Sequence, residues 1–270
     1  MRNVYESGVI TELTQGAIIN NCIAEDFSEC ETYGCVITPR CDLANKGKVS
    51  TFHYLPIVDF ETWVIKVVKP MLLKEYTNNL KEKINSKLRI AGAGENLIDV
   101  FQEKNIILLA GKEKMKSKDF NDFEIICNQY YDGDDVGEKM YLAETKHYKK
   151  LLEDLVKNNI HGYYLIESWE APKKYKIIVL RDVRRMSIAT RAKYENWEDR
   201  GFEDESFYRK NDVSNHVFYS DYYRIVSCLK SPFIENIMQS FSYNFTRIGV
   251  PSFDVSIIDD LSQTIKSILS

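Results

Sequence analysis

The sequence predicts an α+β protein, and three observations predict this class. Short apolar runs separated by turn-prone residues fill the first sixty positions, which is typical of strands. An apolar residue at every fourth position then indicates helices in the centre of the chain. Strand-like runs and a sharply delimited helix follow. We therefore predict a small β-barrel-like part at residues 1–60, a mainly helical insertion at 61–158, and an α+β part at 159–270 that packs on the barrel.

The N-terminal part contains three candidate strands, at residues 16–19, 33–38 and 50–58. Acidic and turn-prone residues lie between these apolar runs, which favours short strands joined by tight connections. Several short strands at this spacing are typical of a small barrel or a curled sheet.

The central part is dominated by an amphipathic helix that follows Pro70. Its apolar residues recur every four positions and form one face; they are Leu72, Tyr76, Leu80 and Ile84. Residues 142–157 show a similar pattern. The apolar run at residues 105–110 fits either a short buried strand or a fragment of a core helix.

The C-terminal part contains strand-like runs at residues 162–167, 175–180, 217–223 and 225–229. A helix follows them. Ser231 is its predicted N-cap, and Pro232 is its predicted first residue. Gly249 and Pro251 are predicted to end this helix, because glycine favours the left-handed cap and proline cannot continue the helix.

Composition excludes a global electrostatic attraction to nucleic acid or anionic lipid, because 36 basic residues face 40 acidic ones. The start of the chain lacks a basic segment followed by a long apolar run, so we predict no signal peptide. No apolar run approaches the length of about 18 residues that predicts a membrane span. We therefore expect a cytoplasmic protein with no membrane partner, whose six cysteines are thiols or metal ligands rather than disulfides.

Four cysteines within twenty residues form a candidate zinc site; they are Cys22, Cys30, Cys35 and Cys41. Four thiolates can bind zinc tetrahedrally. However, no pair has the C-x-x-C spacing that forms half of such a site in advance, and free cysteines are commonly buried as small apolar residues. We therefore predict no cofactor and keep zinc as the alternative to packing.

Cys41 is also a candidate nucleophile, because it follows the end of a predicted strand. A nucleophilic thiol needs a lowered pKa, usually from a histidine, a basic group or a helix N-terminus. Asp42 opposes formation of the thiolate, and the spacing of His53 does not identify it as a base. The alternative is structural: Asp42 ties the following turn and Cys41 packs beneath it.

A basic cluster between Lys173 and Lys193 is a candidate nucleic-acid surface. It includes Lys173, Lys174, Arg181, Arg184, Arg185 and Arg191, with tyrosines interleaved. Basic and aromatic side chains together can hold phosphates and stack on bases. The acidic stretch at residues 195–205 is an alternative partner for these charges, so both interpretations stay open.

Two segments carry recognisable signatures. Residues 36–48 (VITPRCDLANKGK) resemble a TPxCDLAxxK-like motif through Thr38, Pro39, Cys41, Asp42, Leu43, Ala44 and Lys48. Residues 231–251 (SPFIENIMQSFSYNFTRIGVP) resemble an SPFxExxxxxFxxxFxRxGxP-like motif through Ser231, Pro232, Glu235, Phe241, Phe245, Arg247, Gly249 and Pro251. As a pair they resemble a family of bacterial cytosolic proteins, without an assigned activity, whose genes lie near phage-defence or mobile-element genes.

This resemblance implies that the two segments meet in one folded unit. Asp42 and Arg247 would then form a carboxylate–guanidinium contact, which can be bidentate. Such a contact would serve either as a structural latch or as part of a ligand-binding cleft.

The sequence favours a non-enzymatic accessory or sensor component of a bacterial multi-gene system, with phage defence as the context that the resemblance implies. Its predicted partner is a protein from the same operon, bound through a surface rich in aromatic residues, and a homodimer is an alternative assembly. Two other functions stay open. One is an enzyme that uses Cys41 and Asp42 on nucleic acid or a nucleotide, and the other is a nucleic-acid-binding module that uses the basic cluster.

Overall fold

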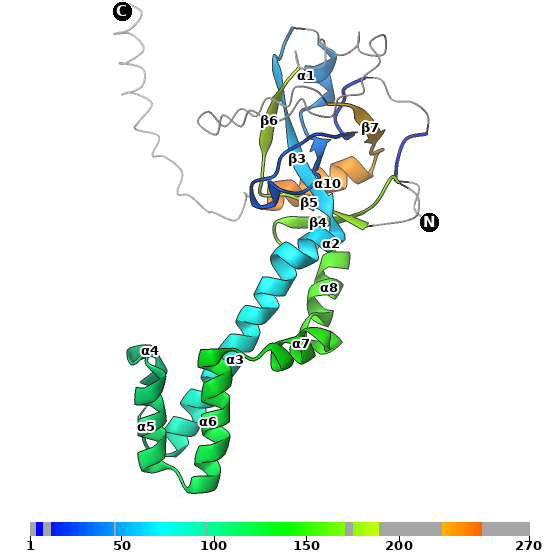
Figure 1. The fold of residues 1–270 in the computed structure, drawn as a ribbon. Coiled ribbons are helices and arrows are strands. Elements are labelled where there is room, and N and C mark those ends of the chain that lie inside the picture. Colours follow the sequence, from blue (N-terminus) through cyan, green and yellow to red (C-terminus); the bar gives the residue numbers. More distant parts are fainter. Residues whose placement is uncertain are drawn as a thin grey trace, which may run out of the picture.

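An antiparallel sheet forms the main body at one end of the molecule (Figure 1). The computed structural model describes residues 4–7, 12–45, 47–94, 97–170, 175–188 and 223–244. The strands within these residues are β1 (Ala17–Ile19), β2 (Tyr33–Val36), β3 (Thr51–Asp59), β4 (Tyr163–Glu167), β5 (Tyr175–Val179), β6 (Arg184–Ser187) and β7 (Ile225–Cys228). Their order is β4-β5-β3-β2-β1-β7, and β6 pairs with β3.

The nine-residue strand β3 organises this sheet. One of its edges pairs with β2, and it also pairs with β6 near its start and with β5 near its end. Strands from before and after the helical insertion therefore belong to one sheet. The predicted mixture of helices and sheet is confirmed, but the barrel is only partial, because the sheet curls without closing.

Six of the predicted strands are confirmed, and five of them are β1 to β5, which lie within the runs at 16–19, 33–38, 50–58, 162–167 and 175–180. The run at 225–229 contains β7. Most of the run at 217–223 lies outside the described residues.

The helical insertion projects from one end of the sheet as a long arm (Figure 1). From β3 the chain continues without a loop into α2 (Phe60–Trp63), a π-helical turn η2 (Val64–Val68) and α3 (Lys69–Ile90). It returns through α4 (Leu97–Val100), α5 (Lys104–Lys114), α6 (Ser117–Asp132), α7 (Asp135–Ala143), η3 (Thr145–His147) and α8 (Lys149–Val156). The run at residues 105–110 is thus part of a helix and not a strand.

The outer half of the arm has a hydrophobic core of its own. Ile84 and Leu88 of α3, Ile107 of α5, and Phe123 and Cys127 of α6 are buried together. The four-residue periodicity predicted for α3 is confirmed, because it supplies this core and the contacts nearer the sheet. Among the described helices, none combines the length and the apolar character that crossing a bilayer requires.

Helix α10 (Phe233–Tyr243) covers one face of the sheet, where Ile234 and Ile237 are buried in the same cluster as Cys35 and Leu55. Side chains alternate along each strand, so Tyr54 lies on the opposite face. Two short helices lie in the N-terminal part, η1 (Glu25–Phe27) and α1 (Arg40–Ala44).

The start of α10 differs from its prediction by one residue. Pro232, not Ser231, is the N-cap, and no side chain caps this helix. A serine cap needs its side-chain oxygen beside the first free N–H groups, and here the helix begins one residue too late for that. The predicted end at Gly249 and Pro251 lies outside the described residues.

A buried cation joins the sheet to the root of the arm. The side chain of Lys176 is only 2% exposed, and its Nζ lies 2.9 Å from Asp59 Oδ1 and 3.4 Å from Glu170 Oε2. The same ammonium lies 4.5 Å from the ring centre of Tyr33 and 4.9 Å from that of Trp169. Two carboxylates and two aromatic faces therefore replace the water that this charge loses on burial.

Replacing Lys176 with methionine should destabilise the protein by about 1–3 kcal/mol, measured by urea denaturation. The substitution leaves Asp59 and Glu170 beside aromatic rings without their cation. The loss is smaller than for a wholly buried pair, because these carboxylate side chains are 40% and 44% exposed.

The matched control is Lys74→Met, on an exposed position of α3. Lysine and methionine have similar helix propensities, so this variant should stay within about 0.5 kcal/mol of the parent protein. Equal losses in the two variants would show that the ammonium of Lys176 contributes nothing specific.

Candidate functional site: two clefts beside helix α10

The first cleft brings the two signature segments together. This signature cleft has a volume of about 580 Å³ and lies between residues 37–53 and two side chains of α10, Met238 and Phe241. Parts of both signatures therefore line one cavity. Arg247 lies outside the described residues, so its contact with Asp42 stays a prediction.

The shape of the signature cleft follows from the way β2 ends. Strand β2 stops at Val36, and Pro39 then becomes the N-cap of α1. Thr38 ties this turn to β3, because its Oγ1 accepts a hydrogen bond of 2.7 Å from the backbone N–H of His53. The side chain of His53 is exposed at the edge of the cleft.

The charged part of the cleft is an ion pair between Asp42 and Lys48. The ammonium of Lys48 donates to Asp42 Oδ1 and holds the pKa of this carboxyl below its usual value. In return, the carboxylate raises the pKa of Lys48. The pair closes the loop from residue 42 to residue 48, which agrees with the interpretation that Asp42 ties this turn.

Cys41 is exposed, so the expectation that it packs beneath the turn is wrong. The physical reason is that α1 begins at Arg40 and directs the next side chain to the surface. The thiol of Cys41 lies 3.6 Å from Asp42 Oδ1 and donates to it.

The four cysteines proposed for zinc lie in different surroundings. Cys22 and Cys35 are buried in clusters on opposite faces of the sheet, Cys30 is half-buried at the root of the arm, and Cys41 is exposed. Burial raises the pKa of Cys22 and of Cys35, which disfavours thiolate ligands. Within the described ranges, no group of three His, Cys, Asp or Glu residues is placed to hold a metal ion.

The basic cluster is only partly described. The guanidinium of Arg184 is buried, where its Nε donates to Asp182 and its Nη2 lies 2.9 Å from Glu25 Oε2. It is thus engaged inside the protein, whereas Arg181 and Arg185 are exposed. The other members, Lys173, Lys174 and Arg191, lie outside the described residues.

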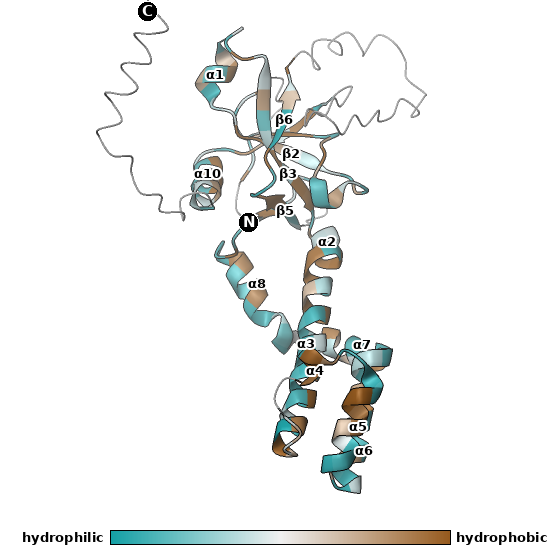
Figure 2. Cartoon of the chain, turned by 90° about the vertical axis from the view of Figure 1, so that its left-hand side faces the viewer, coloured by the Kyte–Doolittle hydropathy of each residue, from teal (hydrophilic) through white to brown (hydrophobic). Residues whose placement is uncertain are grey.

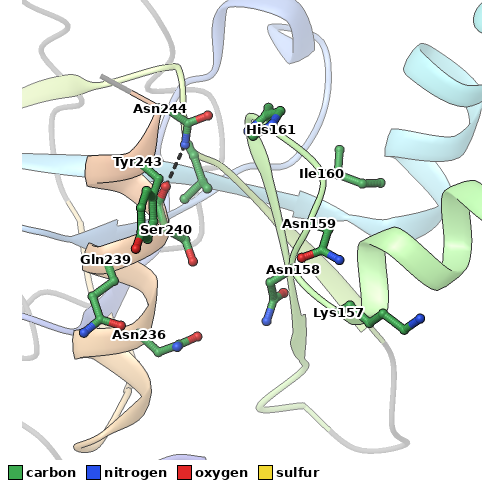
Figure 3. Close-up of a pocket in the computed structure, with 11 residues that line it drawn as sticks. Lys157, Asn158, Asn159, Ile160, His161, Asn236, Gln239, Ser240, Tyr243 and Asn244 are labelled. Atoms are coloured by element: carbon green, nitrogen blue, oxygen red, sulfur yellow. Dashed lines mark hydrogen bonds between the residues drawn. The ribbon is translucent and has the colours of Figure 1, made fainter. Parts of the chain in front are cut away.

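The second cleft lies on a different face of α10, opposite the loop that follows α8 (Figure 3). It has a volume of about 520 Å³, and five of its lining side chains are carboxamides. We call it the amide cleft; these residues are Asn158, Asn159, Asn236, Gln239 and Asn244. Sequence reasoning missed this site, although polar residues recur every four positions at 236, 240 and 244, along α10 and at its C-cap.

The loop side of the amide cleft is shaped by a left-handed residue. Asn158 has a φ of 56° and directly follows Lys157, the C-cap of α8; asparagine is one of the few residues that tolerate this conformation. The N–H of Asn158 donates to Leu155 O at 3.0 Å, and that of Asn159 donates to Asp154 O at 2.8 Å. This cap turns the chain toward α10.

The fold and the two clefts define the kind of protein that this is: a partial antiparallel barrel that carries a projecting helical arm and has cavities on two faces of one covering helix. Comparisons with protein-family models, curated proteins and solved structures find no match for the chain.

In thiol labelling of the native protein, Cys41 should react first. Cys22, Cys35, Cys127 and Cys228 are buried, and their labelling should be slower by a factor on the order of ten or more, because it requires opening of the structure. A disulfide reagent that releases a coloured product will show the phases, and Cys41→Ser should remove the fastest one. A fast phase that survives this substitution would contradict the placement of α1.

The pKa of Asp42 should rise when Lys48 is replaced with methionine, because the ion pair is what lowers it. In the parent protein the pKa of Asp42 is lower in the folded state than in the unfolded state. The ion pair therefore stabilises the loop at higher pH, and this stabilisation is lost as the pH falls through the lowered pKa. Carboxyl-carbon chemical shifts recorded against pH measure the change. Lys66→Met, which removes a pair with Glu29 elsewhere, should leave the Asp42 titration as it was.

Proposed function

We propose that the protein is a non-enzymatic accessory or sensor component of a bacterial multi-gene system, and that it binds a protein partner through its helical arm. The observation that carries this proposal is that α5 presents apolar side chains to solvent as well as to its core. We propose phage defence as the context because the two signature segments resemble a family whose genes lie near phage-defence genes.

The apolar outer side of α5 is unusual for a helix at a protein surface. Ile107 is buried, yet Ile106 and Leu109 are 40% and 58% exposed and lie three residues apart, on one outward face. Val100 and Phe101, immediately before α5, are exposed as well. We call these four residues the α4–α5 strip, and Figure 2 shows the brown of apolar residues on these helices. Apolar side chains that gather on an exposed surface often mark a binding site.

Charge near the strip indicates what kind of protein covers it. Residues 83–94 and 111–124 lie toward the outer end of the arm and together carry seven basic side chains and four acidic ones, in a chain whose net charge is −4 (Figure 1). Lys112, Lys114 and Lys116 are exposed beside the apolar positions. A partner with an acidic rim around an apolar ridge would complement this surface.

Aliphatic residues favour a protein partner over nucleic acid at the arm. Ile106 and Leu109 offer no donors to phosphate and no flat ring on which a base could stack.

The proposal is tested by co-expressing the protein with the products of its neighbouring genes and measuring complex mass by native mass spectrometry. One product should join the parent protein in a fixed ratio. The double variant Ile106→Asp/Leu109→Asp should weaken this complex by about 2–4 kcal/mol, because two apolar contacts become buried charges. The complex should also weaken as salt rises, since the basic end contributes attraction.

The matched control is Ile65→Asp/Val156→Asp, which places two charges at exposed apolar positions nearer the sheet. It should bind as the parent protein does, and circular dichroism should show all three proteins folded. Undiminished binding by the strip variant would refute the role of α5. If the parent protein is a homodimer and only the strip variant is a monomer, the α4–α5 strip binds a second copy of this chain and not a different protein.

A further inference from the structure

We propose that the amide cleft binds the base of a nucleotide, a function separate from partner binding by the arm. Its volume of about 520 Å³ falls within the range of about 300–1,000 Å³ that small-molecule sites occupy. Among the described residues that line it there is one lysine, Lys157, and no carboxylate. These side chains therefore place no negative charge beside a phosphate.

The carboxamides match the hydrogen-bonding edge of a base. Each carboxamide carries a donor and an acceptor in one plane, and each base edge offers the complementary pair. The Oδ1 of Asn236 accepts a hydrogen bond of 2.6 Å from the hydroxyl of Tyr164, which leaves its N–H groups for a ligand. Figure 3 shows Asn236 and Ser240 on the α10 side of the cleft, with Asn159 across from them.

Two carboxamide oxygens at this site still need a donor. The Oδ1 atoms of Asn158 and Asn244 are buried and have no hydrogen-bond partner in the described part of the chain. The amide nitrogen of Asn244 is already used, since it donates to the carbonyl of Ser240 at 2.8 Å. A buried carbonyl oxygen without a donor is unfavourable, so a small rotation that turns either oxygen into the cleft would favour a ligand with an amino group there. The exocyclic amine of adenine, guanine or cytosine is such a group.

The rim of the cleft supplies aromatic surface. Tyr243, at the end of α10, is 68% exposed, and His161 is exposed on the loop side. Figure 3 shows the two rings on opposite walls of the cleft. Exposed aromatic rings of this kind provide faces on which bases stack. Stacking at the rim and hydrogen bonds below it are complementary parts of base recognition.

Titration calorimetry of the full chain with AMP, GMP, CMP and UMP tests this proposal. At least one amino-bearing nucleotide should bind with a dissociation constant on the order of 10 μM to 1 mM. Tyr243→Ala and Gln239→Leu should each weaken binding about tenfold or more, because one removes the stacking face and the other removes a carboxamide. Both positions are exposed, so folding should be kept.

The matched control is Ser242→Ala, an exposed position of the same helix outside the amide cleft. Its binding should equal that of the parent protein within about twofold. The proposal fails if no nucleotide binds up to about 5 mM, if UMP alone binds, or if both cleft variants bind normally. An uncharged peptide that binds where nucleotides do not would also overturn it. The strip variant Ile106→Asp/Leu109→Asp should keep nucleotide binding, so the two proposals can fail independently.

Discussion

The arrangement of sheet and arm depends on the buried ammonium of Lys176. Asp59 is the last residue of β3, so this ion pair lies where the sheet ends and the arm begins. The same ammonium contacts Tyr33 of β2 and Glu170 of the segment after β4. A cation withdrawn from water is tolerated only while its carboxylates and rings remain in place. Segments more than a hundred residues apart are thereby held to one geometry.

The same principle divides the positive charges of the chain into two groups. Near the sheet, Lys176 and Arg184 are buried against carboxylates and are engaged inside the structure. At the outer end of the arm, lysines such as Lys112 and Lys116 face solvent with fewer acidic than basic neighbours. A net charge of −4 therefore conceals an excess of basic side chains at this end of the arm.

Local patterns predicted the elements well and their assembly poorly. The periodicity that includes Leu80 and Ile84 specifies α3, because a helix buries one stripe wherever its partners come from. Pairing of β3 with β5 and β6 joins segments across the whole insertion, and no local periodicity encodes such a register. The burial of Arg184 depends in part on Glu25, a residue distant in sequence, and the exposure of Cys41 follows from a short helix, α1, that was not predicted. The amide cleft escaped notice because Asn158 and Asn236 become neighbours only through tertiary packing.

Because β3 continues into α2, η2 and α3 without a loop, the arm is a continuous extension of a central strand of the sheet. Helix α3 alone has 22 residues and is about 33 Å long, so anything bound at the α4–α5 strip is held well away from both clefts. A ligand in a cleft and a protein on the arm therefore have no reason to collide. Any influence of one on the other would travel through the two connections between arm and sheet, which are the junction beside Asp59 and helix α8, whose following loop lines the amide cleft.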